Sequence, residues 1–197
     1  MFKALKTVEA AATQAAQQAA AQVVDEASRE GHASVVQLLV AASSTDDLWS
    51  ASVAAAGCRE LMKLAKNDDN KKSIAENGGI EAIHGVMDKH GTSNAVVAEN
   101  GCGALWNLAA NNDDNKKRIG EVGGIAMILR MLEVQGASNI GVAKQGCGAL
   151  RNLADNADNK RKILAANGVS MLERMKSKWK RNKGVKTNAN VALRRLR

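Results

Sequence analysis

Apolar residues recur along much of the chain with the spacing of helices that are buried on one side. Between residues 93 and 111 they fall at roughly helical intervals, at Val96, Val97, Cys102, Leu105, Leu108 and Ala109. This period predicts a long helix that starts at Ser93 or Asn94. A second helix is predicted over 125–134, because its apolar residues also share one side and Gly136 ends it.

A short polar segment separates these two helices. The string NNDDNKKRIGEVG begins at Asn111 and predicts a short helix capped by Asp113 or Asp114, whose carboxylates suit the positive end of the helix dipole. Gly123 and Gly124 then break the chain. The DDNKK string could suggest a cation site, but we interpret it as a helix cap.

The same string of residues occurs three times. Copies align from Val53, Val97 and Val142 at a period of 43 to 45 residues, and the string NANVALRRLR reads as a truncated fourth copy. Each copy predicts a short, a medium and a long helix. A unit of this size cannot bury its apolar face alone, so stacked copies must share one core.

The repeated unit resembles the armadillo repeat. The resemblance lies in GALWNLAxNxxNKxxIxxxGGI from Gly103 to Ile125 and in its copies from Gly148 and Arg59. It covers roughly 31–197 and implies an all-α fold, a right-handed α-solenoid of about four armadillo-like repeats with an N-terminal capping helix. HEAT repeats fit less well, since they have two helices per unit and usually a proline. The predicted divisions are an N-terminal helix over 1–29 and a repeat domain over 30–197, with approximate units 30–67, 68–112, 113–156 and 157–197.

The N-terminal segment is rich in alanine and glutamine. We expect its thin apolar stripe to pack on the first repeat as a cap, or alternatively on a partner helix. The stripe consists of Val8, Ala12, Ala15, Ala19, Val23 and Ala27.

Composition favours an intracellular protein without cofactors. The chain has no proline or tyrosine, and its three cysteines stand 44 and 45 residues apart, which suits buried core positions in a reducing compartment. No apolar run reaches the ~18 residues of a membrane span. The default compartment is the cytoplasm, with an organelle complex or a cilium also open.

No set of residues suggests catalysis. The histidines His32, His84 and His90 lack a second ligand at metal spacing, and neither a nucleophile–base pair nor a phosphate loop is present. We therefore expect no enzyme activity, no metal and no cofactor.

The resemblance places a candidate binding site on the long third helices. In armadillo proteins these helices line a groove for extended peptides, and a ladder asparagine holds the peptide backbone. The matching positions here are Lys63, Asn107, Asn152 and Arg195. Importin alpha also carries a tryptophan four residues before that asparagine, and the equivalents here are Arg59, Gly103, Gly148 and Val191, so nuclear-signal recognition is not expected.

The remaining groove residues lean towards positive charge. The groove is also expected to contain Arg59, Arg151 and Arg194. Because these side chains are positively charged, an acidic or phosphorylated segment suits the groove better than a basic one. Trp106 stands beside Asn107, and the sequence leaves open whether it faces the groove or packs between repeats.

The C-terminal end has a charge of its own. From Arg174 to Arg197 there are ten Lys and Arg and no Asp or Glu, whereas the rest of the chain has a net charge of −2. Possible polyanion contacts are Lys176, Lys178, Trp179, Lys180, Arg181, Lys183 and Lys186. This end can be a polar cap or a protein-docking surface, a nucleic-acid site, or a contact with an anionic membrane surface.

The expected function is therefore a non-catalytic protein–protein interaction module. It would be a scaffold or structural subunit of a larger assembly, with a partner segment bound along the third helices. The small number of repeats and the apolar end expected of a truncated last repeat favour permanent residence in a complex. The alternative is a nucleic-acid-binding accessory protein that uses the basic end.

Overall fold

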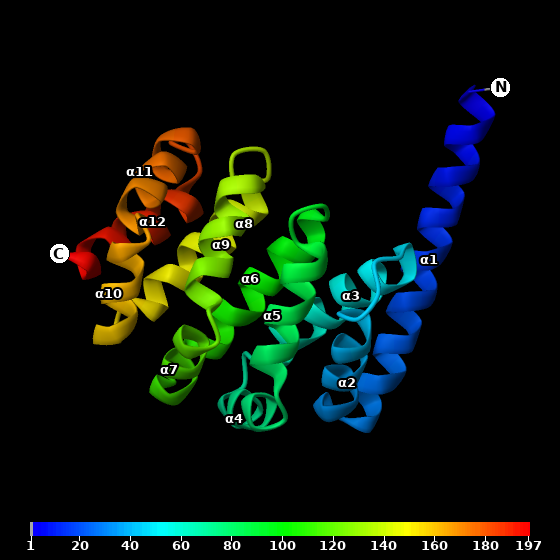
Figure 1. The fold of residues 1–197 in the computed structure, drawn as a ribbon, viewed down its shortest axis with the longest axis horizontal. Coiled ribbons are helices and arrows are strands. Elements are labelled where there is room, and N and C mark those ends of the chain that lie inside the picture. Colours follow the sequence, from blue (N-terminus) through cyan, green and yellow to red (C-terminus); the bar gives the residue numbers. More distant parts are fainter. Residues whose placement is uncertain (1) are drawn as a thin grey trace.

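The predicted all-helical fold is confirmed for the described part of the chain. The computed structural model describes residues 2–197, with side chains from Glu9 onward, and these residues form twelve helices and no strand (Figure 1). The first three are α1 (Phe2–Glu30), α2 (His32–Ala42) and α3 (Leu48–Leu64). The other nine form three units of a short, a medium and a long helix: α4 (Asp68–Glu76), α5 (Gly79–His90), α6 (Ala95–Ala109); α7 (Asp113–Glu121), α8 (Gly124–Val134), α9 (Ile140–Leu153); α10 (Ala157–Ala165), α11 (Gly168–Lys178), α12 (Lys183–Leu196).

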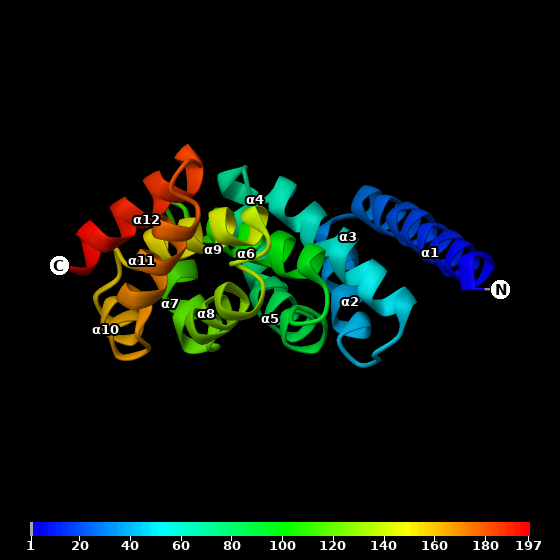
Figure 2. The same cartoon turned by 90° about the horizontal axis from the view of Figure 1, so that it is seen from above.

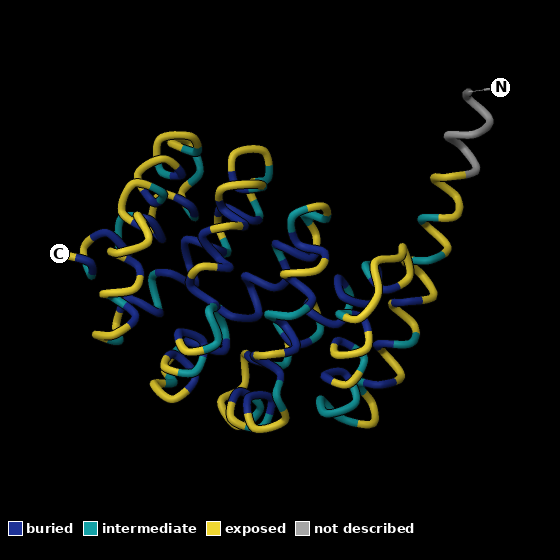
Figure 3. The backbone as a smooth tube through the Cα atoms, viewed as in Figure 1, coloured by how far each residue is buried: buried dark blue, intermediate teal, exposed yellow. Residues whose placement is uncertain are grey.

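The long helices α3, α6, α9 and α12 stack side by side in one row, and each contacts the next (Figure 2). We call these the third helices. Their backbone is largely buried, whereas the short helices and the connecting loops carry most of the exposure (Figure 3). The core is one continuous stack of leucine, isoleucine, methionine and alanine that runs through every repeat.

The helix N-termini use asparagine more than the sequence analysis expected. Asn94, one of the two predicted caps, starts α6 and accepts hydrogen bonds from the backbone of Val96 and Val97. The prediction for α7 is wrong, because Asn112 rather than Asp113 or Asp114 is its cap. The two carboxylates lie in the first turn, where they still favour the helix dipole.

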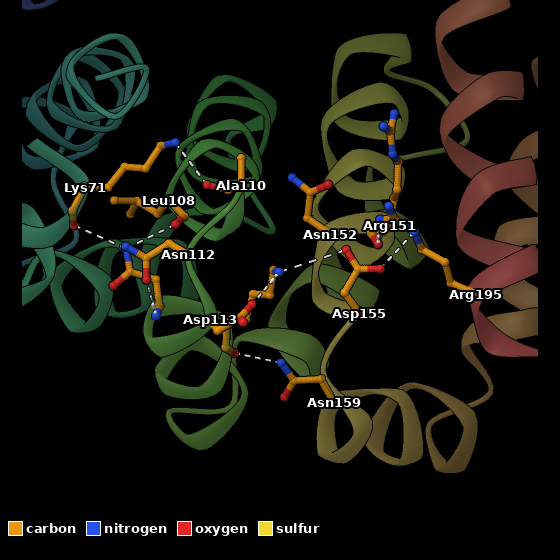
Figure 4. Close-up of polar contacts among 12 residues, drawn as sticks. Lys71, Leu108, Ala110, Asn112, Asp113, Arg151, Asn152, Asp155, Asn159 and Arg195 are labelled. Carbon is orange, nitrogen blue, oxygen red and sulfur yellow. Dashed lines mark hydrogen bonds and ion pairs between the residues drawn. The ribbon is translucent and has the colours of Figure 1, made fainter. Parts of the chain in front are cut away.

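Buried asparagines join successive short helices. Asn115 Nδ2 donates to Lys71 O at 3.2 Å, and Asn159 Nδ2 donates to Lys116 O at 2.7 Å (Figure 4). Lys71 is itself buried and donates to Ala110 O at 3.0 Å. Each repeat thus satisfies backbone carbonyls of its neighbour, which gives a physical reason for the asparagine that recurs in NDDNKK, NDDNKK and NADNKR.

Helix α1 extends the row of third helices. It packs along α3 and also contacts α2, so it occupies the place of a third helix of a missing repeat. The predicted stripe is wrong at Ala12, Ala15 and Ala19, which are exposed. Of its later members, Ala27 is buried and Val23 is half-buried, and the other buried side chains of α1 are Ala20 and Val24. The side chain of Val8 lies outside the described residues.

The fourth repeat is complete, so the prediction of a truncated copy is wrong. It has all three helices, and its end face is largely polar. Lys176 replaces the buried Leu132 of the preceding repeat and pairs with Glu173 at 2.9 Å, while Asn190 stands in the cysteine slot. A polar outer face is what a terminal solenoid repeat needs.

Candidate functional site

The ladder positions share one hydrogen bond that links successive third helices. Asn107 Nδ2 donates to Met62 O at 2.7 Å, and Asn152 Nδ2 donates to Trp106 O at 3.1 Å. Arg195 Nη1 makes the equivalent bond to Arg151 O at 2.7 Å (Figure 4). These carbonyls lie in the last turn of the preceding third helix, where no intrahelical donor remains.

The shared bond leaves half of each asparagine amide available. The oxygens Oδ1 of Asn107 and Asn152 accept no hydrogen bond from the described residues, and both side chains are half-buried. An amide that is anchored through one N–H still offers an acceptor and a second donor. The structure therefore lines up two fixed amides, one on α6 and one on α9, at the same register.

Lys63, at the first ladder position, has a different role. Its Nζ lies 3.0 Å from Glu60 Oε2, and Glu60 Oε1 accepts from Ser28 Oγ of α1 at 3.1 Å. The lysine charge is thus neutralised within α3, and Glu60 joins α3 to α1.

Trp106 packs between two third helices and stays partly exposed. A methyl group at Gly148 of α9 would lie 2.5 Å from Trp106 Cδ2, so the indole rests directly on the bare backbone there. Met62 of α3 covers Gly103 of α6 in the same way. The absence of an aromatic side chain from this slot on α6 and α9 therefore has a physical reason: Gly103 and Gly148 stand there because a large side chain of the preceding helix occupies the space above each.

The charges on the surface of the third helices are only partly balanced. Asp155 Oδ1 lies 2.9 Å from Arg195 Nε, and its other oxygen lies 4.0 Å from Lys116 Nζ (Figure 4). In the described chain, neither Arg59 nor Arg151 has a carboxylate within 4.0 Å. Asp155 is thus committed to its partners, whereas Arg59 and Arg151 and the half-buried Glu99 of α6 form no ion pair among the described residues.

The other two predicted groove arginines lie apart from the ladder. Arg194 lines a depression of about 470 Å³ at the C-terminal end, with Glu173 and Lys176 of α11. Arg59 lines a depression of about 400 Å³ between α1, α3 and the start of α6. The structure therefore brings Asn107, Asn152 and Arg195 into one line and places Arg59 and Arg194 at opposite ends.

Helix α1 also contributes to this surface, which was not predicted from the sequence. Gln14, Gln17 and Gln18 line the same depression as Arg59. Their i, i+3, i+4 spacing puts them on one helix side, which is a readable signal. The two roles predicted for this helix, a cap or a contact with a partner helix, rest on its apolar stripe and do not include these amides.

The basic C-terminal end divides into paired and unpaired cations. Arg174 Nη2 lies 2.7 Å from Glu133, and Lys176 Nζ lies 2.9 Å from Glu173. Trp179 Nε1 donates to Gly136 O at 2.8 Å, so the indole is fixed to the preceding repeat. Five exposed cations have no carboxylate within 4.0 Å among the described residues: Lys178, Lys180, Arg181, Lys183 and Lys186.

The three cysteines lie in the core, as the period predicted. Burial raises the pKa of the Cys58 and Cys147 thiols to about 12 and that of Cys102 well above its usual range. Across residues 2–197 no cluster of three His, Cys, Asp or Glu side chains is arranged to hold a metal ion. None of the described helices combines the length and apolarity needed to cross a membrane.

Comparison with known proteins identifies the fold. No protein-family model matches the chain, and no curated protein matches it. Among solved structures, the designed armadillo repeat protein YIII(Dq)4CqI is 23% identical, with a TM-score of 0.71 over 94% of this chain and 74% of that chain. A second design, solved in complex with peptide (KR)4, is 21% identical, with a TM-score of 0.70 over the same shares. An engineered protein is 25% identical, with a TM-score of 0.69 over 84% of this chain and 37% of that chain. The chain therefore has the armadillo-repeat fold that its repeated motif predicted.

Proposed function

We propose that this chain is a non-catalytic interaction module that binds an extended, acidic segment of a partner protein along its third helices. The observation that carries the proposal is the register of Asn107, Asn152 and Arg195, whose side chains are anchored by equivalent hydrogen bonds. Anchored amides lose little conformational freedom when they bind a backbone, which favours affinity.

Charge supports an acidic ligand. Arg59 and Arg151 carry unpaired charges, while Glu60 and Asp155 are held in ion pairs by Lys63 and Arg195. A design with this fold binds a (KR)4 peptide. Arg151 on α9, together with Arg59 at the α1 end of the surface, favours the opposite sign of ligand charge, because unpaired guanidinium groups attract carboxylates and phosphates.

The test uses two labelled peptides and the intact chain. Fluorescence anisotropy would compare fluorescein-labelled (Asp-Glu)4 with (Lys-Arg)4 at low salt. We expect the acidic peptide to bind on the order of tenfold more tightly. Equal binding of both peptides, or preference for (Lys-Arg)4, would show that the charge argument is wrong.

A matched pair of variants separates binding from stability. Asn152→Ala removes a ladder amide and should weaken (Asp-Glu)4 binding about three- to tenfold, the value of one or two hydrogen bonds. Asn159→Ala removes a similar inter-repeat amide bond on the short helices, away from the ladder. It should leave binding unchanged. If the two variants weaken binding equally, the ladder amides do not contact the peptide.

We further propose that the bound segment belongs to a neighbouring subunit of a larger assembly, since four third helices offer only a short surface. Light scattering on the endogenous protein from gently lysed cells, before and after nuclease, tests this. A large, nuclease-resistant species is expected. A free monomer of about 21 kDa in both conditions would leave only transient peptide binding.

A further inference from the structure

In the last three repeats, the turn between the second and third helices is held to the preceding repeat by one side-chain hydrogen bond. A side chain at the end of the second helix bonds a backbone oxygen of the preceding repeat: His90 Nε2 lies 2.8 Å from Ala42 O, and Gln135 Nε2 donates to Thr92 O at 2.7 Å. In the fourth repeat, Trp179 Nε1 donates to Gly136 O at 2.8 Å. One N–H donor therefore satisfies this contact, and the glutamine amide supplies it without an aromatic ring.

The ring of Trp179 borders an open depression. The depression has a volume of about 500 Å³ and is lined by Ile140, Asn182 and the run from Lys178 to Arg181. Ile140 is 42% exposed and Trp179 is half-buried. The corner thus presents an aromatic ring and an aliphatic side chain to solvent at the edge of the third helices.

Unpaired positive charge surrounds this apolar surface. Lys178, Lys180, Arg181 and Lys183 are exposed, and none has a carboxylate within 4.0 Å in the described chain. The equivalent turns of the two preceding repeats, 91–93 and 136–138, contain no charged residue. A cap role requires polar side chains, but it does not require four cations around a partly exposed indole.

We propose that this corner, formed by Ile140, Lys178, Trp179, Lys180 and Arg181, binds single-stranded nucleic acid. One base stacks on the open side of the indole, and the lysines and the arginine contact the phosphates on either side. Stacking surfaces combined with flanking cations are the chemistry by which proteins hold single strands without reading their sequence. The carboxylates of an acidic peptide would pair with the cations, but they would not stack on the indole ring. A membrane surface requires more than two apolar side chains to insert.

The first experiment measures anisotropy of a fluorescein-labelled 12-nucleotide oligo(dT) at 50 and 200 mM NaCl. Trp179→Gln is the decisive variant, because glutamine supplies the same donor in the preceding repeat. It should keep the thermal melting curve and lose on the order of tenfold in affinity, the typical value of one stacked base. Unchanged oligonucleotide affinity in this variant, or no binding by the natural chain, would overturn the proposal.

The charge contribution has a matched control. Lys180→Ser with Arg181→Ser should weaken binding and reduce the slope of log K against log salt by about 1.4. Lys72→Ser with Lys117→Ser removes the same charge from exposed positions on α4 and α7. It should leave the slope nearly unchanged. Equal slopes for the two double variants would mean that the corner is not the site.

Two further measurements separate this site from other sources of binding. Asn107→Ala with Asn152→Ala should leave oligonucleotide affinity unchanged, so the proposed function and this site fail or survive independently. Vesicles of phosphatidylserine and phosphatidylcholine serve as the other anionic probe. Binding to vesicles without binding to the oligonucleotide would identify a membrane contact and refute the nucleic-acid assignment.

Discussion

Because Trp106 packs on Gly148, the effect of Gly148→Ala on the free energy of unfolding should change sign when Trp106 is removed. Gly148 lies within α9, where alanine is favoured over glycine by about 1 kcal/mol. However, a Cβ atom at this position would lie 2.5 Å from Cδ2 and 2.7 Å from Cε2 and Cε3 of the indole. The ring is rigid, so it must move off the helix, and overpacking of this kind costs about 1–3 kcal/mol.

Gly148→Ala should therefore lower the free energy of unfolding by up to about 2 kcal/mol, because the steric cost exceeds the gain in helix propensity. In a Trp106→Ala background the obstruction is gone. The same Gly148→Ala change should then raise the free energy of unfolding by about 1 kcal/mol.

Urea unfolding followed by far-UV circular dichroism gives the four free energies of this double-mutant cycle. The expected coupling is about 1–3 kcal/mol. If Gly148→Ala has the same effect in both backgrounds, Trp106 does not lie on the bare backbone of α9. The physical explanation for the missing aromatic ladder would then be wrong.

Three other predictions concern buried or capping groups. Asn159→Ala should cost about 1–3 kcal/mol in urea unfolding because it leaves the buried Lys116 carbonyl without its donor, whereas the exposed Arg161→Ala should stay within about 0.5 kcal/mol. The three thiols should react with Ellman's reagent at pH 8 roughly a thousandfold more slowly than in the unfolded chain, since their pKa values are raised by burial; full labelling of native protein within seconds would contradict this. The backbone N–H of Ser50 lowers the pKa of Asp47, so this cap stabilises the fold above pH 4 and the stabilisation is lost as the pH falls through the lowered pKa. The melting-temperature advantage of the natural chain over Asp47→Asn should accordingly shrink between pH 6 and pH 2, and a difference that does not change with pH would refute the assignment.

The sequence predicted the order of helices well because burial repeats with the period. Positions such as Ile74, Ile119 and Ile163 are all fully buried, so the apolar pattern reports the same packing each time. The apolar pattern could not distinguish the observed cap of α7, Asn112, from the predicted Asp113 one residue later. Asparagine and aspartate are similarly good caps, and Asn112 directly precedes Asp113.

The register of α1 could not be read from its composition. Alanine occupies several helix sides at once, so the hydrophobic contrast between neighbouring stripes is small. The fourth repeat was misjudged for a related reason. Lys183, Lys186 and Asn188 make the first half of α12 look polar, although Val185 and Ala189 in the same half are fully buried.

Part of the candidate site was also present in the sequence but was not recognised. Trp106 stands three residues after Gly103, and Gly148 takes the aromatic slot of the next copy. These two facts describe one packing contact, yet they become linked only when the distance between α6 and α9 is known. The ladder asparagines were found by resemblance, while the bonds that anchor them required the structure.

The side-chain-to-backbone hydrogen bonds between third helices all run in one direction along the chain. Asn107, Asn152 and Arg195 bond carbonyls that lie 44 to 46 residues earlier, so the last turn of each third helix is completed by the repeat that follows it. During synthesis on the ribosome, that following repeat needs about two to nine seconds to emerge. The last turns of α3, α6 and α9 in the nascent chain must therefore wait with open carbonyls until the following repeat has emerged.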